Sequence, residues 1–300
     1  MRSLMESIPN FSEGRRPEVI EKIVSAARSV SEVRILDLHS DEDHNRSVLT
    51  LAGPAEALQE SLFRTVEVAT QLIDLRGHTG EHPRIGATDV VPFVPLGETS
   101  MTEAVEAART LAQRVASELE IPVYFYEEAA TRPDRRNLEH IRGKGFEDLR
   151  DNISADQERV PDLGPSAVHP TAGAIVIGAR GPLIAYNVYL NTEDVKVAKE
   201  IARAIRHSSG GLRYVKAMGF EIPARRQTQV SMNLTNYRAS SIYTVFELIK
   251  RMAEAHGVLV VESEVVGLLP MQALTDAARF YLRLHQFDLD QVLETKLMGD

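Results

Sequence analysis

The chain has 300 residues, of which 43% are apolar and 26% charged, and its formal net charge is −9. It contains no cysteine, which excludes disulfides, thiol nucleophiles and cysteine-ligated metals and agrees with a cytoplasmic protein. Nucleic-acid-binding proteins usually have a basic bias, and no apolar run reaches the roughly 18 residues that span a membrane. We therefore expect neither nucleic acid nor a membrane as a partner, and the start MRSLMESIPNFSEG lacks the apolar segment of a signal peptide.

The first half alternates short strands with amphipathic helices. In chain order the pattern predicts a strand at 4–9, a helix at 17–30 with Pro17 in its first turn, strands at 33–40 and 46–53, a helix at 54–75, a strand at 89–95, a helix at 100–119 and a strand at 122–126. Ser100 and Glu103 form a capping box for the last of these helices. Residues 127–165 carry many charges and few β-branched side chains, so we expect helical or irregular connecting structure there.

The second half repeats the same order of elements. The pattern predicts a strand at 182–191, a helix at 193–206 capped by Thr192, strands at 212–222 and 224–236, a helix at 241–256 capped by Ser240 or Ser241, and a strand at 258–268. Each half therefore reads βαββαβ, the order of a ferredoxin-like fold. We predict an α+β protein with two ferredoxin-like subdomains, 1–178 and 179–300, whose four-stranded antiparallel sheets face one another as an α/β sandwich.

The stretch RGHTGEHPRIGATD, directly before the predicted strand at 89–95, gathers unusual polar residues. A metal site is one interpretation, because His78 and His82 are four residues apart, the spacing of two ligands on one helix face. The glycines and Pro83 between and beside them disfavour a helix. His39 and His44, with Asp37, could add ligands, so a metal hydrolase stays open as one class of function.

General base catalysis without a metal is the second interpretation of this stretch. An imidazole with a pKa near ~6.5 suits proton removal at neutral pH, and His82 is restrained between Glu81 and Pro83. Arg76 and Arg84 flank it and could bind a carboxylate. We favour this interpretation over a polar surface loop.

Three further polar segments carry candidate binding residues. Asn10 lies in the turn IPNFSEG, and Asn187 and Asn233 lie on alternating polar faces of the predicted strands AYNVYLN and QTQVSMNLTN. Such faces suit a polar heterocycle, and a solvated sheet face is the alternative. The Gly- and Pro-rich segment VPDLGPSAVHPTAG either presents backbone N–H groups to a ligand or makes a tight connection.

Five motifs together resemble the formiminotransferase domain of the formiminotransferase-cyclodeaminase family, in order and spacing and over essentially the whole chain. They are IPNFSEGRR, TGEHPRIGATDVVPFVP, VPDLGPSAVHP, QTQVSMNLTN and VVGLLPMQALTDAARFY. The resemblance implies two ferredoxin-like subdomains with the folate between them. It implies transfer of a formimino group between N-formimino-L-glutamate and N5 of tetrahydrofolate, in histidine degradation and one-carbon metabolism. It also implies tetrahydrofolate as co-substrate, no metal, and a cytoplasmic homodimer.

The resemblance also implies roles for individual residues. His82 corresponds to the family's catalytic base. The folate contacts correspond to Pro161, Asp162, Leu163, Gly164, Pro165, Ser166, Ala167, Val168, His169 and Pro170, and we add Asn187 and Asn233 to them. For the substrate we predict contacts from Arg84, Asp37, His39, Arg46 and Asn10. Both substrates carry carboxylates, and the candidate arginines are Arg46, Arg64, Arg76, Arg84 and Arg180, with Arg84 first.

Two departures from the family keep alternatives open. Well-known members carry an acidic residue where this chain has His39, which leaves the donor substrate open. Formyl transfer from 5-formyltetrahydrofolate to glutamate is the alternative reaction, and a non-catalytic folate-binding protein is the alternative outside the enzymes. Those members also continue into a cyclodeaminase domain, whereas this chain ends at residue 300, so we expect a separate enzyme to take the product.

Overall fold

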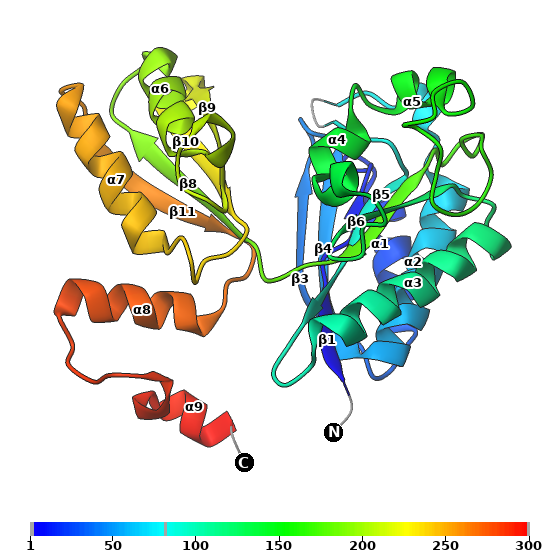
Figure 1. Cartoon of the computed structure of the whole chain (residues 1–300), viewed down its shortest axis with the longest axis horizontal. Helices are drawn as coiled ribbons and strands as arrows, with labels where there is room; N and C mark the ends of the chain where they lie inside the picture. Colours follow the sequence, from blue (N-terminus) through cyan, green and yellow to red (C-terminus); the bar gives the residue numbers. More distant parts are fainter. Residues whose placement is uncertain (1–2, 81–82, 299–300) are drawn as a thin grey trace. The chain divides into compact units, whose positions relative to one another are not determined.

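In a computed structural model, which describes residues 3–80 and 83–298, the chain is a mixed α+β protein with two sheets. It divides into two compact units, Met1–Arg180 and Gly181–Asp300 (Figure 1). Each unit has a sheet and a hydrophobic core of its own. The expectation that the two sheets face one another stays a prediction.

The first unit is built on a seven-stranded sheet. Its strands within the described residues are β1 (Leu4–Ser7), β2 (Asn10–Phe11), β3 (Arg34–Asp41), β4 (Arg46–Pro54), β5 (Thr88–Pro95), β6 (Val123–Glu127) and β7 (Ile175–Ala179). Its α-helices in the same part of the chain are α1 (Pro17–Arg28), α2 (Ala55–Leu72), α3 (Met101–Glu118), α4 (Leu138–Arg142) and α5 (Phe146–Asn152).

This sheet has an antiparallel part and a parallel part. Strand β4 pairs antiparallel with β3, β1 and β2, and β1 and β2 also pair antiparallel with β5. Strands β7 and β6 then extend the sheet in parallel beyond β5. The sheet is therefore larger than the four antiparallel strands that we expected. The long connection through α3 makes this extension possible, because parallel neighbours need a crossover.

Helices cover the two parts of the sheet differently. Buried side chains of α1, α2 and α3 form the main core on one face, while Ile141 of α4 and Leu149 of α5 pack with Val90, Tyr124 and Val176 on the other face (Figure 1). The parallel part is thus covered on both faces, as parallel sheets usually are. Three of the predicted substrate residues lie in the antiparallel part, Asp37 and His39 on β3 and Arg46 at the start of β4.

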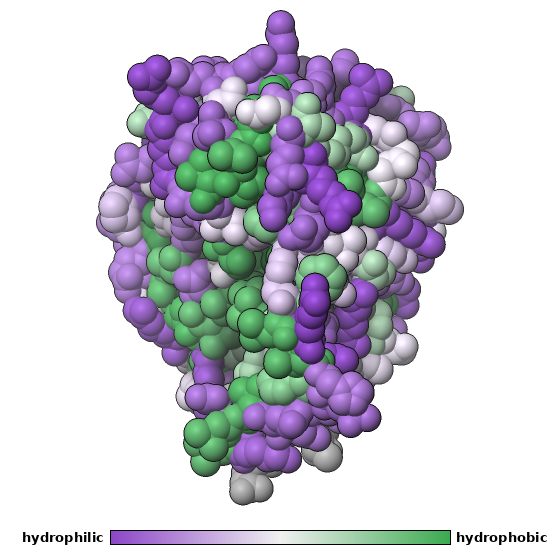
Figure 2. Space-filling view, turned by 90° about the vertical axis from the view of Figure 1, so that its left-hand side faces the viewer, coloured by the Kyte–Doolittle hydropathy of each residue, from purple (hydrophilic) through white to green (hydrophobic). Residues whose placement is uncertain are grey.

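The second unit has a four-stranded antiparallel sheet in the order β11-β8-β10-β9. Its elements are β8 (Ile184–Leu190), α6 (Val195–Ile205), β9 (Val215–Ile222), β10 (Gln227–Leu234), α7 (Ile242–Ala255), β11 (Val260–Val266), α8 (Met271–Leu282) and α9 (Leu293–Met298). Alternate residues of β8 and β10 pack with α6 and α7 in one core. Apolar side chains also gather on the surface in Figure 2, which looks from the side of α7 and α8, and Leu274 and Phe280 of α8 are exposed.

Local chemistry explains most differences from the predicted elements. The predicted strand at 4–9 is interrupted at Pro9, which has no N–H for the ladder, and pairing resumes at Asn10. Helix α6 is capped by Asp194, which accepts a hydrogen bond from the backbone N–H of Lys196, so the prediction of Thr192 was wrong. Ser241 is the cap of α7. The capping box of Ser100 is confirmed.

Candidate functional site

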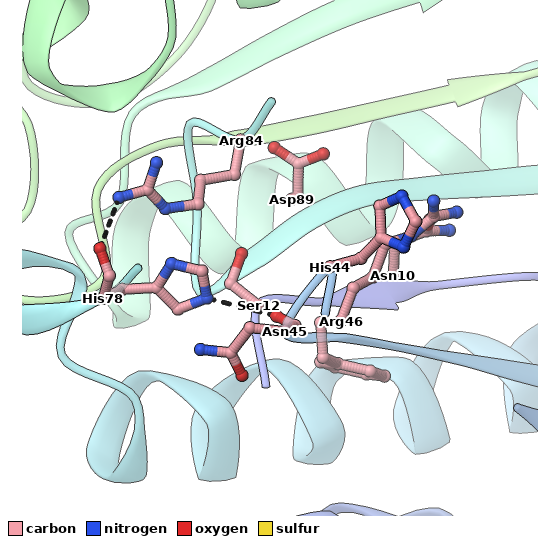
Figure 3. Close-up of a pocket in the computed structure, with 9 residues that line it drawn as sticks. Asn10, Ser12, His44, Asn45, Arg46, His78, Arg84 and Asp89 are labelled. Carbon is pink, nitrogen blue, oxygen red and sulfur yellow. Dashed lines mark hydrogen bonds between the residues drawn. The ribbon is translucent and has the colours of Figure 1, made fainter. Parts of the chain in front are cut away.

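A hollow in the first unit lies where β2, the start of β4 and the loop before β5 meet (Figure 3). The hollow is small and partly open to solvent. Its lining is mostly polar and consists of Asn10, Phe11, Ser12, His44, Asn45, Arg46, His78, Arg84 and Asp89. The fold thus brings together three residues that we predicted to bind substrate, Asn10, Arg46 and Arg84.

Arg84 links the loop before β5 to His78 and to helix α5. Its Nη2 donates to the carbonyl oxygen of His78 at 2.9 Å (Figure 3). The same Nη2 donates to Oε1 of Glu147 on α5 at 2.9 Å. The side chain is 12% exposed. Its Nε is buried and has no hydrogen-bond partner among residues 3–80 and 83–298. Arg84 therefore anchors the loop with one end of its guanidinium and keeps one donor for another group.

A second cationic group comes from β4. Burial and, to a smaller extent, the charge of Arg142 lower the pKa of Arg46 to about 10, against the opposing charges of Asp89 and Asp41. Arg46 is still a cation at neutral pH. Asp89 is committed to other partners, because its carboxylate accepts from the backbone N–H of Ile85 at 2.7 Å and from Nε of Arg142 at 2.9 Å. The hollow thus favours an anionic group.

Asn45 ties three segments of the site together. Its Oδ1 accepts from the backbone N–H of Gly14 at 2.9 Å, and its Nδ2 donates to the carbonyl oxygen of Thr79 at 3.0 Å. Its own carbonyl oxygen lies 3.1 Å from Nε2 of His78. Asn45 has a φ of 48°, in the left-handed region that Asn tolerates better than most residues. The segments around Gly14, Asn45 and Thr79 therefore depend on one side chain for their relative positions.

His78 contributes an imidazole to the same hollow (Figure 3). Burial lowers its pKa below the usual value of 6.5, and the charges of Arg84 and Arg15 act in the same direction. The hydrogen bond with Asn45 and the charge of Glu13 oppose them. The neutral form of His78 is therefore favoured at neutral pH.

The residues that directly follow the Gly- and Pro-rich segment 161–170 bond to both sides of the loop that precedes β5. The backbone N–H of Leu75 donates to the carbonyl of Thr171 at 2.9 Å, and that of Ala87 donates to Ala172 at 2.8 Å. At its other end, the Asp162 carboxylate accepts from the Phe125 N–H, from Thr131 and from Arg135. Asp162 thus fixes the segment in place, while Gly164 to Ala167 are exposed.

Among the remaining predicted site residues, those that the structure describes do not line this hollow. Asp37 and His39 lie on β3, opposite Thr50 and Val48 of β4. His82 lies outside the described residues. Asn187 and Asn233 belong to the second unit, where Nδ2 of Asn187 donates to Oε2 of Glu264 at 3.1 Å and Asn233 is exposed.

Two of the other candidate arginines form ion pairs away from the hollow. Nε of Arg64 donates to Glu60 at 2.7 Å on the surface of α2, and Nη2 of Arg76 lies 2.5 Å from Asp74. Neither of them lines the hollow. Arg46 and Arg84 are thus the two predicted carboxylate-binding arginines that the fold brings to one place.

Sequence reasoning missed two roles in the hollow. The sequence suggests His78 only as a metal ligand and assigns no role to Asn45. The relevant signal for Asn45 is the position of an Asn at the end of a short polar turn between two strands, which is typical of a left-handed residue.

Among the described residues, no group of three or more His, Asp or Glu side chains is arranged to hold a metal ion. None of the described helices is both long and apolar enough to cross a membrane.

The fold and the hollow together define a two-unit α+β protein with a cationic polar pocket. The family model "Formiminotransferase domain, N-terminal subdomain" matches residues 4–180, and "Formiminotransferase domain" matches residues 185–297. The chain belongs to the formiminotransferase family.

Known proteins match this chain over most or all of its length. The chain is 45% identical over 300 residues to a "Glutamate formimidoyltransferase" of Streptococcus pyogenes, covering 100% of both chains. It is 49% identical to a protein of the same name from Thermoplasma acidophilum, covering 98% of this chain and 97% of the other. It is also 41% identical to the rat "Formimidoyltransferase-cyclodeaminase", covering 94% of this chain and 53% of that protein.

Proposed function

We propose that this chain is a transferase that moves the formimino group between N-formimino-L-glutamate and N5 of tetrahydrofolate. The observation that carries the proposal is the identity of 45% and 49% to relatives named glutamate formimidoyltransferase, which spans nearly the full length of both partners. Tetrahydrofolate enters as the acceptor because the family motifs of this chain imply it.

The hollow supports this substrate class. N-formimino-L-glutamate carries two carboxylates, and Arg46 and Arg84 each have a buried Nε without a partner in the described part of the chain. A guanidinium N–H and a carboxylate form a charge-assisted hydrogen bond, which is strengthened where water is excluded. We assign the carboxylates of the substrate to these two arginines.

We assign the general base to His82, on the motif GEHPRIG. N5 of the folate attacks the formimino carbon, and a bond forms between them. The proton of N5 passes to the imidazole of His82, and the bond from the carbon to the glutamate nitrogen breaks as that nitrogen receives the proton. One imidazole serves both steps in turn, first as base and then as acid. Its described neighbours are anchored, since Thr79 bonds with Asn45 and Arg84 bonds with Glu147.

We assign folate contacts to the exposed part of the segment 161–170 and to the polar strand face of the second unit that carries Asn187 and Asn233. The backbone bonds of Thr171 and Ala172 to the residues flanking the loop 76–86 support the first part. We further propose that the second unit is ferredoxin-like, which its βαββαβ order and antiparallel sheet support.

A homodimer is part of the proposal, and sedimentation of the purified chain tests it.

The reaction is tested by glutamate release from N-formimino-L-glutamate in the presence of tetrahydrofolate. We expect turnover by the wild type and a loss of orders of magnitude in His82→Ala, with folate binding retained. His207→Gln, an exposed position of the second unit, is the control and keeps wild-type turnover. A wild type that releases no glutamate contradicts the proposal, and 5-formyltetrahydrofolate with glutamate is then the pair to offer.

A further inference from the structure

The hydrogen bond between His78 and Asn45 determines which nitrogen of the imidazole carries its proton. Nε2 of His78 lies 3.1 Å from the carbonyl oxygen of Asn45. A carbonyl oxygen only accepts, so Nε2 must be the donor. In a neutral imidazole the other nitrogen, Nδ1, then has a free lone pair and is an acceptor.

That acceptor has nothing to bind within the described chain. Nδ1 of His78 is buried and has no hydrogen-bond partner among residues 3–80 and 83–298. Buried polar atoms are normally paired, because leaving one unpaired costs about 1–3 kcal/mol. Figure 3 shows the imidazole held at its Nε2 side by Asn45, beneath the side chain of Arg84. Burial and the nearby cation both oppose a second proton, so Nδ1 remains an acceptor at neutral pH.

Two further buried atoms in this hollow also lack partners in the described chain, and both are donors. They are Nε of Arg46 and Nε of Arg84. A ligand that satisfies all three atoms must offer anionic oxygens to the two arginines and an N–H or O–H to His78. A bare carboxylate serves only the arginines. An α-carboxylate with a substituted N–H on the neighbouring carbon offers both kinds of partner, an anionic oxygen for an arginine and an N–H for His78.

We propose that His78 is a substrate-binding residue whose Nδ1 accepts a hydrogen bond from the N–H that joins the formimino group to the α-carbon of glutamate. This inference rests on the proposed function, because that substrate carries the N–H beside its α-carboxylate. His78 orients the leaving nitrogen relative to the attacking N5, and no proton passes through His78 itself. The nitrogen still has an N–H for Nδ1 after the formimino carbon has left.

Two substitutions of His78 separate its two nitrogens. Asn places an amide oxygen near the position of Nδ1, so His78→Asn keeps an acceptor but loses the donor to Asn45. Gln places an amide N–H near the position of Nε2, so His78→Gln keeps the donor but loses the acceptor. We expect His78→Gln to raise the KM for N-formimino-L-glutamate about ten- to a hundredfold, with the KM for tetrahydrofolate unchanged. We expect His78→Asn to stay within a few-fold of the wild type.

The two variants should differ in stability in the opposite order to their activity, and this makes the test specific. His78→Asn loses the bond to Asn45 and should unfold at lower denaturant concentration than His78→Gln. If His78 were only structural, activity would follow stability and His78→Gln would be the better enzyme. A wild-type KM in His78→Gln, or equal impairment of both variants, overturns the inference.

Direct binding separates this inference from the proposed function. Calorimetric titration with N-formimino-L-glutamate needs no turnover, and we expect the same order of affinities, with wild type and His78→Asn above His78→Gln. A wild type that binds but transfers nothing contradicts the proposed reaction and leaves the role of His78 standing. Equal affinities of the wild type and His78→Gln in an active enzyme overturn only the role of His78.

Discussion

Asn45 offers the sharpest test of how the site is held together. Its side chain makes two hydrogen bonds, to Gly14 and Thr79, and it is 8% exposed. Each bond contributes about 1 kcal/mol. Its left-handed backbone, with a φ of 48°, costs an Ala about 1 kcal/mol more than an Asn or Gly. Asn45→Ala should therefore lower the free energy of unfolding by about 3 kcal/mol, and Asn45→Gly by about 2 kcal/mol.

Urea unfolding of the purified variants measures both values. Both variants should also raise the KM for N-formimino-L-glutamate, since the segments on either side of the hollow lose their shared anchor. The difference between Ala and Gly isolates the backbone conformation, because both remove the same two hydrogen bonds. Equal unfolding free energies for the two variants, or a loss below about 1 kcal/mol for Asn45→Ala, would refute the reasoning.

Three further predictions concern the same unit. Gly80→Ala should destabilise the chain and impair turnover, because the added Cβ would lie 2.4 Å from the backbone oxygen of His44. Gly77→Ala is the control: its added Cβ would have nothing within 4 Å, so the midpoint of urea unfolding should stay within experimental error of the wild type. Asp162→Asn should lower the free energy of unfolding by about 3 kcal/mol or more, because it breaks a nearly buried ion pair with Arg135, and an unchanged urea midpoint would contradict this. Lowering the pH from 6.5 should destabilise the chain, because His78, whose folded pKa is below 6.5, takes up its proton more readily when unfolded. Melting temperatures across pH 5–7.5 should then fall less steeply for His78→Gln than for the wild type.

Much of the secondary structure could be predicted from periodicity and capping residues alone. Helices such as α3 have a clear apolar stripe and a capping box, and these signals are local. The parallel extension by β7 and β6 could not be predicted, because it depends on which strand edge a distant segment joins. The pairing of Val176 with Val90 leaves no local signal in either strand.

The site, like the fold, could be predicted only in part from the sequence. Arg84 and Arg46 could be identified from the chemistry that a dicarboxylate substrate requires. The role of His78 could not, because it follows from one contact with the backbone of Asn45, a residue 33 positions earlier in the chain. Hydrogen bonds to backbone carbonyls are independent of the partner's side chain, so they cannot be predicted from residue types alone.

The fate of the formimino carbon tests the central claim most directly. N-formimino-L-glutamate labelled with ¹³C at that carbon is incubated with the chain and tetrahydrofolate, and the labelled product is followed by NMR. The account predicts that the label becomes bonded to N5 of the folate while unlabelled glutamate is released, with no transfer by His82→Ala. A label that stays on glutamate, or that leaves as a free hydrolysis product, would contradict it.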